Sequence, residues 1–277
     1  MSAARSARPV KAITLAGLAN RLRHLDCALD LAARLERPVE LIWPMDRDLH
    51  CPFERLFDVP DAVVRIIEQS HGNYPLHDKI LRKISFPGRH YLTSEHFGEL
   101  TQEKRAMGLD HAIMAERMPA SDLIIFRSGQ RSYLPEVPYA WLRPSAMIDG
   151  LTQAVTAGYS SKMLGVHVRR TDHVHAIRHS PMETFLSEVD RKMATEGFTG
   201  LFLATDDDDA EQAICAQYPD TLIYRKRSRD RNQPVAIEDA LVDFICLSRT
   251  DEILGSAGSS FSQEAALLGA VVLNIAC

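Results

Sequence analysis

The second half of the sequence alternates short apolar runs of strand length with longer runs of helical periodicity. Strands that alternate with helices form parallel sheets, because each helix carries the chain back to the start of the next strand. This half is therefore predicted to be a doubly wound α/β domain. The expected strands are 163–168, 200–205, 221–224, 252–254 and 270–275, and the expected helices are 182–195, 208–217, 237–248 and 263–268.

The first half of the sequence opens in the same way, with strand, helix and strand in succession. Leucines at helical spacing follow the first strand, and Pro38 ends that helix. The stretch that follows is less regular and rich in Gly and Pro. The expected elements of this half are strands at 10–15, 39–43, 63–67 and 123–126 and a helix at 18–35.

A cluster of prolines separates the two halves, at Pro135, Pro138 and Pro144. Clustered prolines interrupt regular structure, so we place a domain junction near 135–160. The expected organisation is an N-terminal α/β domain at 1–150 and a C-terminal Rossmann-like domain at 151–277.

The composition excludes several classes of protein. The net charge is −5 and the pI is near 6.1, whereas a general nucleic-acid binder presents a basic surface. The five cysteines form no CxxC pair, which is typical of a reducing compartment. The longest uncharged apolar run, 265–277, is shorter than the roughly 20 residues that span a bilayer. We therefore expect a cytoplasmic protein with no transmembrane segment and no nucleic-acid partner.

Charged residues follow the apolar strand at 163–168. Strand alternation places His167 and Arg169 on one face, and Val168 and Arg170 on the other. Two arginines at the end of a buried strand require anionic partners. They either bind a phosphate or form structural ion pairs, and the sequence alone leaves both possibilities open. The carboxylates available for such pairs are Asp172, Asp206 and Asp207.

Two further strand ends also carry polar residues. At least one aspartate of the run 206–209 is expected to cap the helix that follows. The loop 255–262, with the sequence GSAGSSFS, runs into a helix, and N–H groups at a helix N-terminus bind phosphate. Ligands of parallel sheets bind beyond the carboxyl ends of the strands. Three such ends favour a phosphate-containing ligand, although the chain has neither a P-loop nor a GxGxxG fingerprint.

The segments GVHVRRTD, FLATDD, LVDFICLS and GSSFSQEAALLG, in this order, resemble the GDP-fucose-dependent fucosyltransferase superfamily. The likeness is greatest to the α1,6-fucosyltransferases, including the rhizobial nodulation group, and more distant to the protein O-fucosyltransferases. It is strong over about 160–275, weaker over 12–60 and essentially absent from 60–160. The resemblance implies a GT-B-like fold, in which two Rossmann-like domains with parallel sheets face a cleft.

The resemblance also implies roles for individual residues. Arg169 would hold the β-phosphate and stabilise the charge that develops as GDP leaves, with Arg170 in support and His167 in the same site. Asp243 would bind the guanine edge, which offers two N–H donors. The remaining implied positions are Ser259, Ser260, Ser262, Asp206 and Asp207 for the donor, and Asn20 and Arg21 at a turn facing the acceptor cleft.

The resemblance implies no metal or other cofactor, and the chemistry permits this: a guanidinium can donate two charge-assisted hydrogen bonds to the phosphate of the GDP-sugar substrate. One departure from the superfamily concerns the general base that an inverting transfer needs. Where the α1,6 enzymes carry a glutamate, residues 173–179 (HVHAIRH) contain no carboxylate. His175 and His179 are the nearest candidates, although such residues more commonly lie at the surface. The irregular histidine spacing argues against a metal site.

We therefore expect a glycosyltransferase of polysaccharide biosynthesis. It would transfer fucose, or a related deoxyhexose, from GDP-fucose to a hydroxyl of a glycan or lipid-linked oligosaccharide, with inversion and without a metal. Two alternatives remain open. The missing glutamate favours a non-catalytic nucleotide-sugar-binding protein on the same fold, and the spacing of the residues is equally compatible with a different nucleotide sugar.

Overall fold

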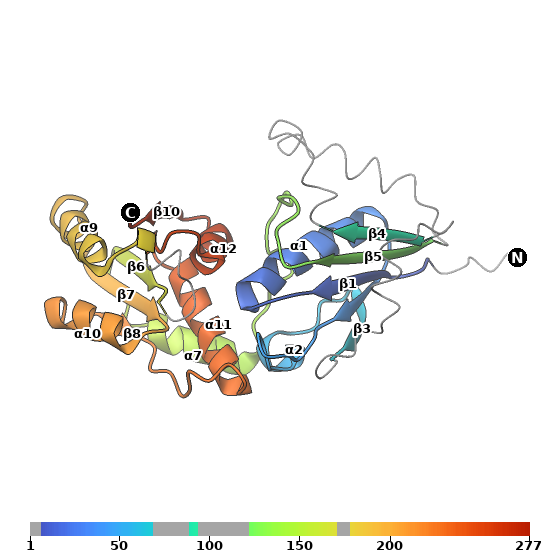
Figure 1. Ribbon diagram of the computed structural model, residues 1–277, viewed down its shortest axis with the longest axis horizontal. Coiled ribbons are helices and arrows are strands. Elements are labelled where there is room, and N and C mark those ends of the chain that lie inside the picture. Colours follow the sequence, from blue (N-terminus) through green and yellow to red (C-terminus); the bar gives the residue numbers. More distant parts are fainter. Residues whose placement is uncertain (1–6, 69–88, 94–121, 171–177) are drawn as a thin grey trace, which may run out of the picture. The chain divides into compact units, whose positions relative to one another are not determined.

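The computed structural model describes residues 7–68, 89–93, 122–170 and 178–277 of the 277. The chain divides into two compact units, Met1–Arg143 and Pro144–Cys277. Each unit contains one five-stranded sheet in which the paired strands run parallel, with helices packed against it (Figure 1). The two parallel sheets confirm the α/β fold class.

The sheet of the first unit has the strand order β3-β2-β1-β5-β4, so its first strand lies in the centre. Helix α1 packs against β1 through an apolar stripe that includes the buried Leu22, Leu25 and Ala28. The elements are β1 (Val10–Thr14), α1 (Leu18–Arg34), β2 (Val39–Ile42), α2 (Phe53–Leu56), β3 (Val63–Ile67), β4 (Arg89–Thr93) and β5 (Leu123–Ser128).

The sheet of the second unit has the order β10-β9-β6-β7-β8, and its first strand, β6, is again central. The elements are α7 (Ala146–Thr156), β6 (Met163–Val168), α9 (Met182–Thr195), β7 (Gly200–Thr205), α10 (Asp208–Gln217), β8 (Leu222–Ile223), α11 (Pro234–Ser248), β9 (Glu252–Gly255), α12 (Ser260–Gly269) and β10 (Val272–Ile275).

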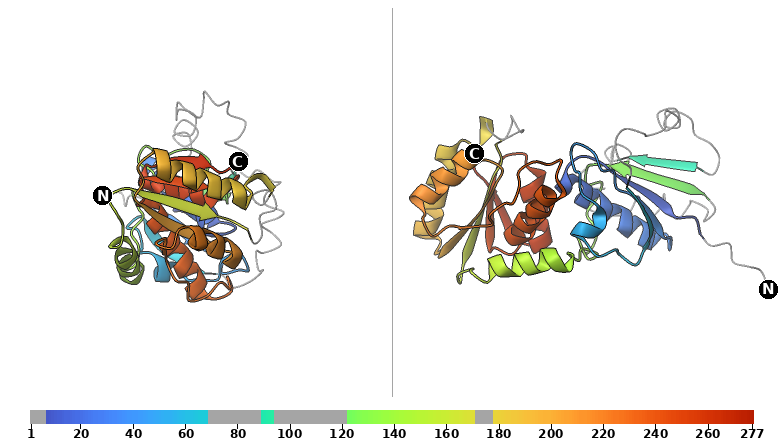
Figure 2. Two further views of the ribbon diagram at one scale, coloured as in Figure 1. Left: turned by 90° about the vertical axis from the view of Figure 1, so that its left-hand side faces the viewer. Right: turned by 90° about the horizontal axis from the view of Figure 1, so that it is seen from below.

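Different helices cover the two faces of this second sheet (Figures 1 and 2). Val166 and Val168 of β6 are buried in a core that also holds Phe185 of α9 and Ile214 of α10. On the other face, α11 contacts β6 and β7 and packs against α7 and α12. Consecutive residues of β6 therefore point toward different helices, and the ring of His167 stacks on α12 rather than entering this core.

A topological switch point lies beside the central strand of each sheet. In the second unit β6 pairs with β7 on one side and with β9 on the other. The chain leaves β6 toward α9 and leaves β9 toward α12, so the two connections turn to opposite faces. In the first unit β1 lies between β2 and β5 in the same way. Open α/β sheets bind their ligands at such points.

The main difference from the expected elements is helix α7. It lies in the stretch 135–160 where a domain junction was placed; the division falls within that stretch, between Arg143 and Pro144, and α7 belongs to the second unit. The short α2 and β4 were also not expected. In the described part of the chain, no helix is long and apolar enough to cross a membrane.

Candidate functional site

The structure brings the three polar strand ends together at one edge of the second sheet. Strands β9, β6 and β7 are adjacent and parallel, so the loops that follow them emerge side by side. The backbone N–H of Arg169 donates to Ser256 Oγ at 2.9 Å, and that of Arg170 donates to Asp206 Oδ1 at 2.9 Å. These bonds tie the end of β6 to both neighbouring loops.

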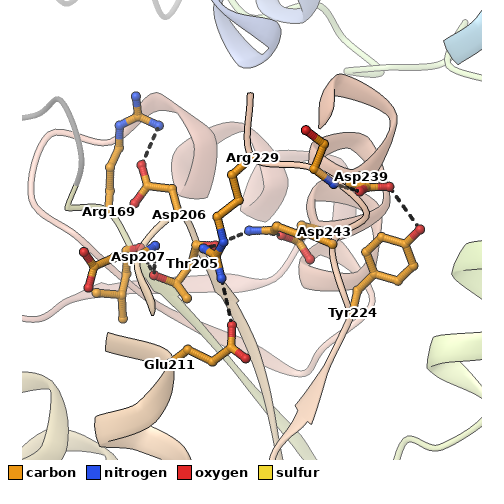
Figure 3. A network of polar contacts seen from close by, with 12 residues as sticks. Arg169, Thr205, Asp206, Asp207, Glu211, Tyr224, Arg229, Asp239 and Asp243 are labelled. Carbon is orange, nitrogen blue, oxygen red and sulfur yellow. Dashed lines mark hydrogen bonds and ion pairs between the residues drawn. The ribbon is translucent and has the colours of Figure 1, made fainter. Parts of the chain in front are cut away.

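The two arginines after β6 have different partners. Nη1 of Arg169 lies 3.8 Å from Asp206 Oδ2, and the Arg169 side chain is 23% exposed (Figure 3). Nη2 of Arg170 donates to the carbonyl oxygen of Ser180 at 2.7 Å. The ion pair that the sequence left open thus exists for Arg169, but at the limit of contact distance and partly in solvent, where such pairs contribute little. Through this bond Arg170 stabilises the segment before α9.

His167 is buried beneath these arginines as a neutral ring. Its imidazole stacks on Phe261 of α12, with 4.8 Å between ring centroids. Burial and the positive charge of Arg169 lower the pKa of His167 to about 3. Its buried Nδ1 has no hydrogen-bond partner in the described structure. Nδ1 of the neutral imidazole can donate or accept one hydrogen bond with a ligand. As a base this weak, however, His167 accepts a proton poorly near neutral pH.

The serine-rich loop after β9 leads into α12. Ser259 occupies the N-cap position, yet its side chain makes no capping bond, and its buried Oγ has no hydrogen-bond partner among the described residues. Ser260 is the first residue of the helix. The hydroxyl of Ser262 donates to the carbonyl oxygen of Ser259 at 3.3 Å and so stabilises the turn. The Ser259 hydroxyl and the first N–H groups of α12 are suited to an anionic ligand.

The two aspartates after β7 have separate roles. Asp207 caps α10, because its Oδ1 accepts the N–H of Ala210 at 2.8 Å, which confirms the cap expected within 206–209. Asp206 instead faces the cations of the site. Its Oδ2 lies 3.8 Å from Nη1 of Arg169 and 3.8 Å from Nη2 of Arg231. Asp206 therefore organises arginines, whereas Asp207 supports the helix.

Asp243 presents a buried carboxylate from α11. The residue is 3% exposed, and its Oδ2 lies 3.0 Å from Nζ of Lys226. Its other oxygen, Oδ1, is buried without a hydrogen-bond partner in the described structure. Burial raises the pKa of Asp243 to about 6, and Lys226 opposes that rise. A buried carboxylate oxygen is costly unless it receives a hydrogen bond, so Oδ1 is suited to an N–H of a ligand.

The loop between β8 and α11 supplies basic residues that the sequence analysis did not single out. Asp239 accepts the Tyr224 hydroxyl at 3.1 Å (Figure 3). The buried Asp239 also forms an ion pair with Arg227 at 2.6 Å, which anchors the loop to α11. Lys226 donates to the carbonyl oxygen of Thr205 at the end of β7. The only sequence feature that could have pointed to these basic residues is the charged run YRKRSRDR at 224–231.

Asn20 and Arg21 lie in the first unit, near the start of α1. The Arg21 side chain is fully buried: Nη2 lies 2.9 Å from Asp46 Oδ1, and Nε donates to the carbonyl oxygen of Ala16 at 2.6 Å. Its guanidinium also lies over the ring of Trp43, 5.1 Å from the centroid. These contacts give Arg21 a structural role in its own unit. A role of either residue toward an acceptor stays a prediction.

Some of the predicted chemistry falls outside this geometry. His173, His175 and Asp172 lie outside the described residues, and His179 is exposed before α9. Within the described ranges, no group of three or more His, Cys, Asp or Glu side chains could hold a metal ion. The general base and metal independence therefore stay predictions.

Comparison with known proteins relates the chain to fucosyltransferases through its fold. No protein-family model and no curated protein matches the sequence. Among solved structures, the chain is similar to the NodZ α-1,6-fucosyltransferase soaked with GDP-fucose, with a TM-score of 0.62 and 20% identity over 95% of this chain and 93% of that one. A NodZ fucosyltransferase from Bradyrhizobium gives a TM-score of 0.63 and 19% identity, over 95% of this chain and 92% of that one.

Two other fucosyltransferase structures share this fold. POFUT1 in complex with GDP gives a TM-score of 0.55 and 15% identity, over 98% of both chains. A mutant of FUT1 from Arabidopsis thaliana in complex with GDP gives 0.62 and 14%, over 98% of this chain and 70% of that one. The chain therefore has the fold of the GDP-fucose fucosyltransferases, and the resemblance seen in the strand-end motifs is confirmed at the level of the fold.

Proposed function

We propose that the second unit binds a GDP-sugar at the carboxyl ends of β6, β7 and β9, and that the protein transfers the sugar to a glycan. The observation that carries this proposal is a set of buried polar atoms that lack partners in the described structure: His167 Nδ1, Asp243 Oδ1 and Ser259 Oγ. Native proteins leave few buried polar atoms unpaired. The resemblance implies a role in donor binding for Asp243 and Ser259 and places His167 in the same site.

The chemistry of a nucleoside diphosphate matches these groups. Asp243 offers a carboxylate to the N–H donors of a guanine edge. Arg169 and Ser259 offer a guanidinium and a hydroxyl to the pyrophosphate, next to the N-terminus of α12. Several of the similar structures are complexes with GDP or GDP-fucose, which supports the proposal.

The proposed reaction is an inverting, metal-independent transfer of fucose from GDP-fucose. As the bond to the sugar breaks, negative charge collects on the β-phosphate, and a guanidinium held close by stabilises that charge more in the transition state than in the ground state. Arg169 is the residue to which we assign this role. The acceptor is a hydroxyl of a glycan or lipid-linked oligosaccharide in cytoplasmic polysaccharide biosynthesis, with Asn20 on the acceptor side.

The first test is calorimetric binding of GDP, GDP-fucose, GDP-mannose and UDP in the presence of a chelator. Wild type is compared with Arg169→Ala and with Arg191→Ala, an exposed arginine of α9 whose partners are Glu188 and Glu196. We expect metal-independent binding of the guanine nucleotides that only Arg169→Ala weakens. A protein that binds none of the four, or binds UDP as well as GDP, contradicts the proposal.

A second candidate function is a non-catalytic protein that binds nucleotide sugars. Two observations favour it: residues 173–179 contain no carboxylate, and His167 is too weak a base to accept the acceptor proton near neutral pH. The test is incubation with GDP-fucose and a panel of glycan acceptors. GDP-fucose binding without hydrolysis or transfer on any acceptor supports this candidate, and turnover on one acceptor rejects it.

A further inference from the structure

We propose that Lys226 is a positioning residue for nucleotide selection, which holds the Asp243 carboxylate ionised and oriented so that Oδ1 can accept an N–H of the base. The inference rests on the proposed function, because it assigns a partner to the residue expected to bind guanine. Lys226 lies in the charged run of the loop before α11, which no motif of the sequence assigns to the site.

The geometry fixes the carboxylate at one oxygen and leaves the other available. Nζ of Lys226 lies 3.0 Å from Asp243 Oδ2 and also donates to the carbonyl oxygen of Thr205. The ammonium is thus held between α11 and the end of β7. Rotation of the Asp243 side chain would break the ion pair inside a buried site, so the pair fixes the direction of Oδ1. Oδ1 itself is buried and has no hydrogen-bond partner among the described residues.

The charges around Asp243 leave Lys226 as the principal compensating group. Burial raises the pKa of Asp243 to about 6; Lys226 and, more weakly, Arg229 lower it, while Asp239 raises it. Tyr159 and Cys246 also interact electrostatically with Asp243, but burial raises the pKa of both, so both are neutral near pH 7. Without Lys226 the pKa of Asp243 would rise further, so the carboxyl group would stay protonated closer to neutral pH.

Protonation changes what the carboxyl group can recognise. An ionised carboxylate accepts hydrogen bonds at both oxygens, whereas a protonated one donates at one of them. Guanine presents only donors at the edge that would face Asp243. Lys226 therefore sets the pH range over which the site accepts a guanine nucleotide.

The experiment is the affinity for GDP, by calorimetry, from pH 5.5 to 9 for wild type and Lys226→Met. We expect wild type to lose affinity only below about pH 6. In Lys226→Met, loss of an adjacent opposite charge should raise the Asp243 pKa by about one to three units. Affinity at pH 7 should then fall by about tenfold and recover by pH 9. Lys226→Gln is the second variant, in case the methionine does not fold.

The matched control is Lys162→Met. Lys162 is a partly buried lysine of the same unit whose Nζ donates to the carbonyl oxygen of Glu196 and lies 4.4 Å from the Phe198 ring centroid, so its loss should leave the pH profile unchanged. If Lys226 has only a structural role, Lys226→Met should weaken GDP binding equally at every pH, and that result would overturn the inference. Tighter binding in Lys226→Met would also overturn it, since Lys226 would then compete with the base.

The same data separate this inference from the proposed function. If wild type binds GDP and the profiles of wild type and Lys226→Met coincide, the role of Lys226 is wrong and the GDP site stands. If wild type binds no guanine nucleotide at any pH, the proposed function fails and the inference fails with it.

Discussion

At the scale of single residues, the proposed transfer should depend on the shape of the Arg169 side chain as well as on its charge. Arg169 follows the buried strand β6, with its N–H bonded to Ser256 and its guanidinium at the edge of the sheet, near Asp206. A guanidinium binds two oxygens of one phosphate in a fixed plane, whereas an ammonium is a point charge. Turnover should therefore respond to shape at this position.

We predict that Arg169→Ala lowers kcat/KM for fucosyl transfer by about a hundredfold to a thousandfold, the usual cost of one lost transition-state donor. Arg169→Lys should restore only part of this loss, because the charge returns without the two-pronged geometry. The measurement is transfer from GDP-fucose under saturating acceptor. Equal activity of Arg169→Lys and wild type would show that charge alone suffices.

Asp243 is expected to determine which base is bound. In Asp243→Asn the amide keeps one acceptor and replaces the other with a donor, which faces the donors of guanine. GDP affinity should fall by about tenfold to a hundredfold, the usual range for a hydrogen bond to a charged group. Competition calorimetry with UDP provides the comparison, and equal weakening of GDP and UDP would show that Asp243 does not contact the base.

At the scale of elements, the contact between β9 and α12 holds the serine loop. A Cβ added to Gly255, the last residue of β9, would meet Ser262 Oγ at 2.6 Å. Since Ser262 is fully buried, the helix start must shift to make room. We predict that Gly255→Ala weakens GDP binding beyond what its loss of stability, measured by the melting temperature, can account for.

Gly150→Ala in α7 is the control for this prediction, because a Cβ there meets nothing within 4 Å. It should leave GDP affinity unchanged, and replacing glycine within a helix should slightly stabilise the protein. If Gly255→Ala lowers the melting temperature but leaves GDP affinity unchanged, the β9–α12 contact does not contribute to ligand binding and the prediction is wrong.

Periodicity predicted most elements because their apolar faces are dense, and the exceptions have thin ones. Helix α7 buries only Ile148 and Thr152, and carries a glycine in its middle. Strand β4 is a five-residue edge strand with the polar sequence RHYLT. A helix with so few buried residues, and a strand whose only apolar residues are Tyr91 and Leu92, were not expected from the sequence.

The site was predictable where strand ends alone define it, and not where partners come from distant loops. Parallel topology was enough to place Arg169, Asp206 and Ser259 at one edge. Lys226 was missed because a charged run usually indicates a solvent-exposed surface. The burial of Arg21 could not be foreseen either, because it depends on a partner in the loop that follows β2, Asp46.

At the scale of the whole molecule, each unit contains a buried neutral histidine. Burial lowers the pKa of His24 in the first unit to about 4 and that of His167 in the second to about 3, from 6.5. As the pH falls below 6.5, the unfolded chain takes up these protons and the folded units do not, so each histidine costs stability. In the second unit, Asp243 takes up a proton in the folded state near pH 6, which opposes the effect of His167.

We therefore predict that the two units respond differently to mild acid. Between pH 6.5 and 5 His24 should cost the first unit about 1.5 kcal/mol of unfolding free energy, from about 1.4 kcal/mol per pH unit for one proton, and the raised pKa of the buried Asp26 carboxyl opposes part of that loss. The second unit should change little. Denaturant titrations across this range test the prediction, with His24→Gln expected to abolish the slope of the first unit. A steeper acid loss in the second unit would contradict it.

The central position of β6 and β1 also has a consequence during synthesis. Each of these strands completes its pairing with a segment far along the chain: Leu164 with Glu252, and Val10 with Ile124. A ribosome adds about 5–20 residues per second, so one edge of each strand waits for several seconds without its partner. Exposed edges of apolar strands are sites of aggregation. The delay in these two pairings should therefore make the nascent chain prone to aggregation, and slower translation or lower temperature should change its soluble yield.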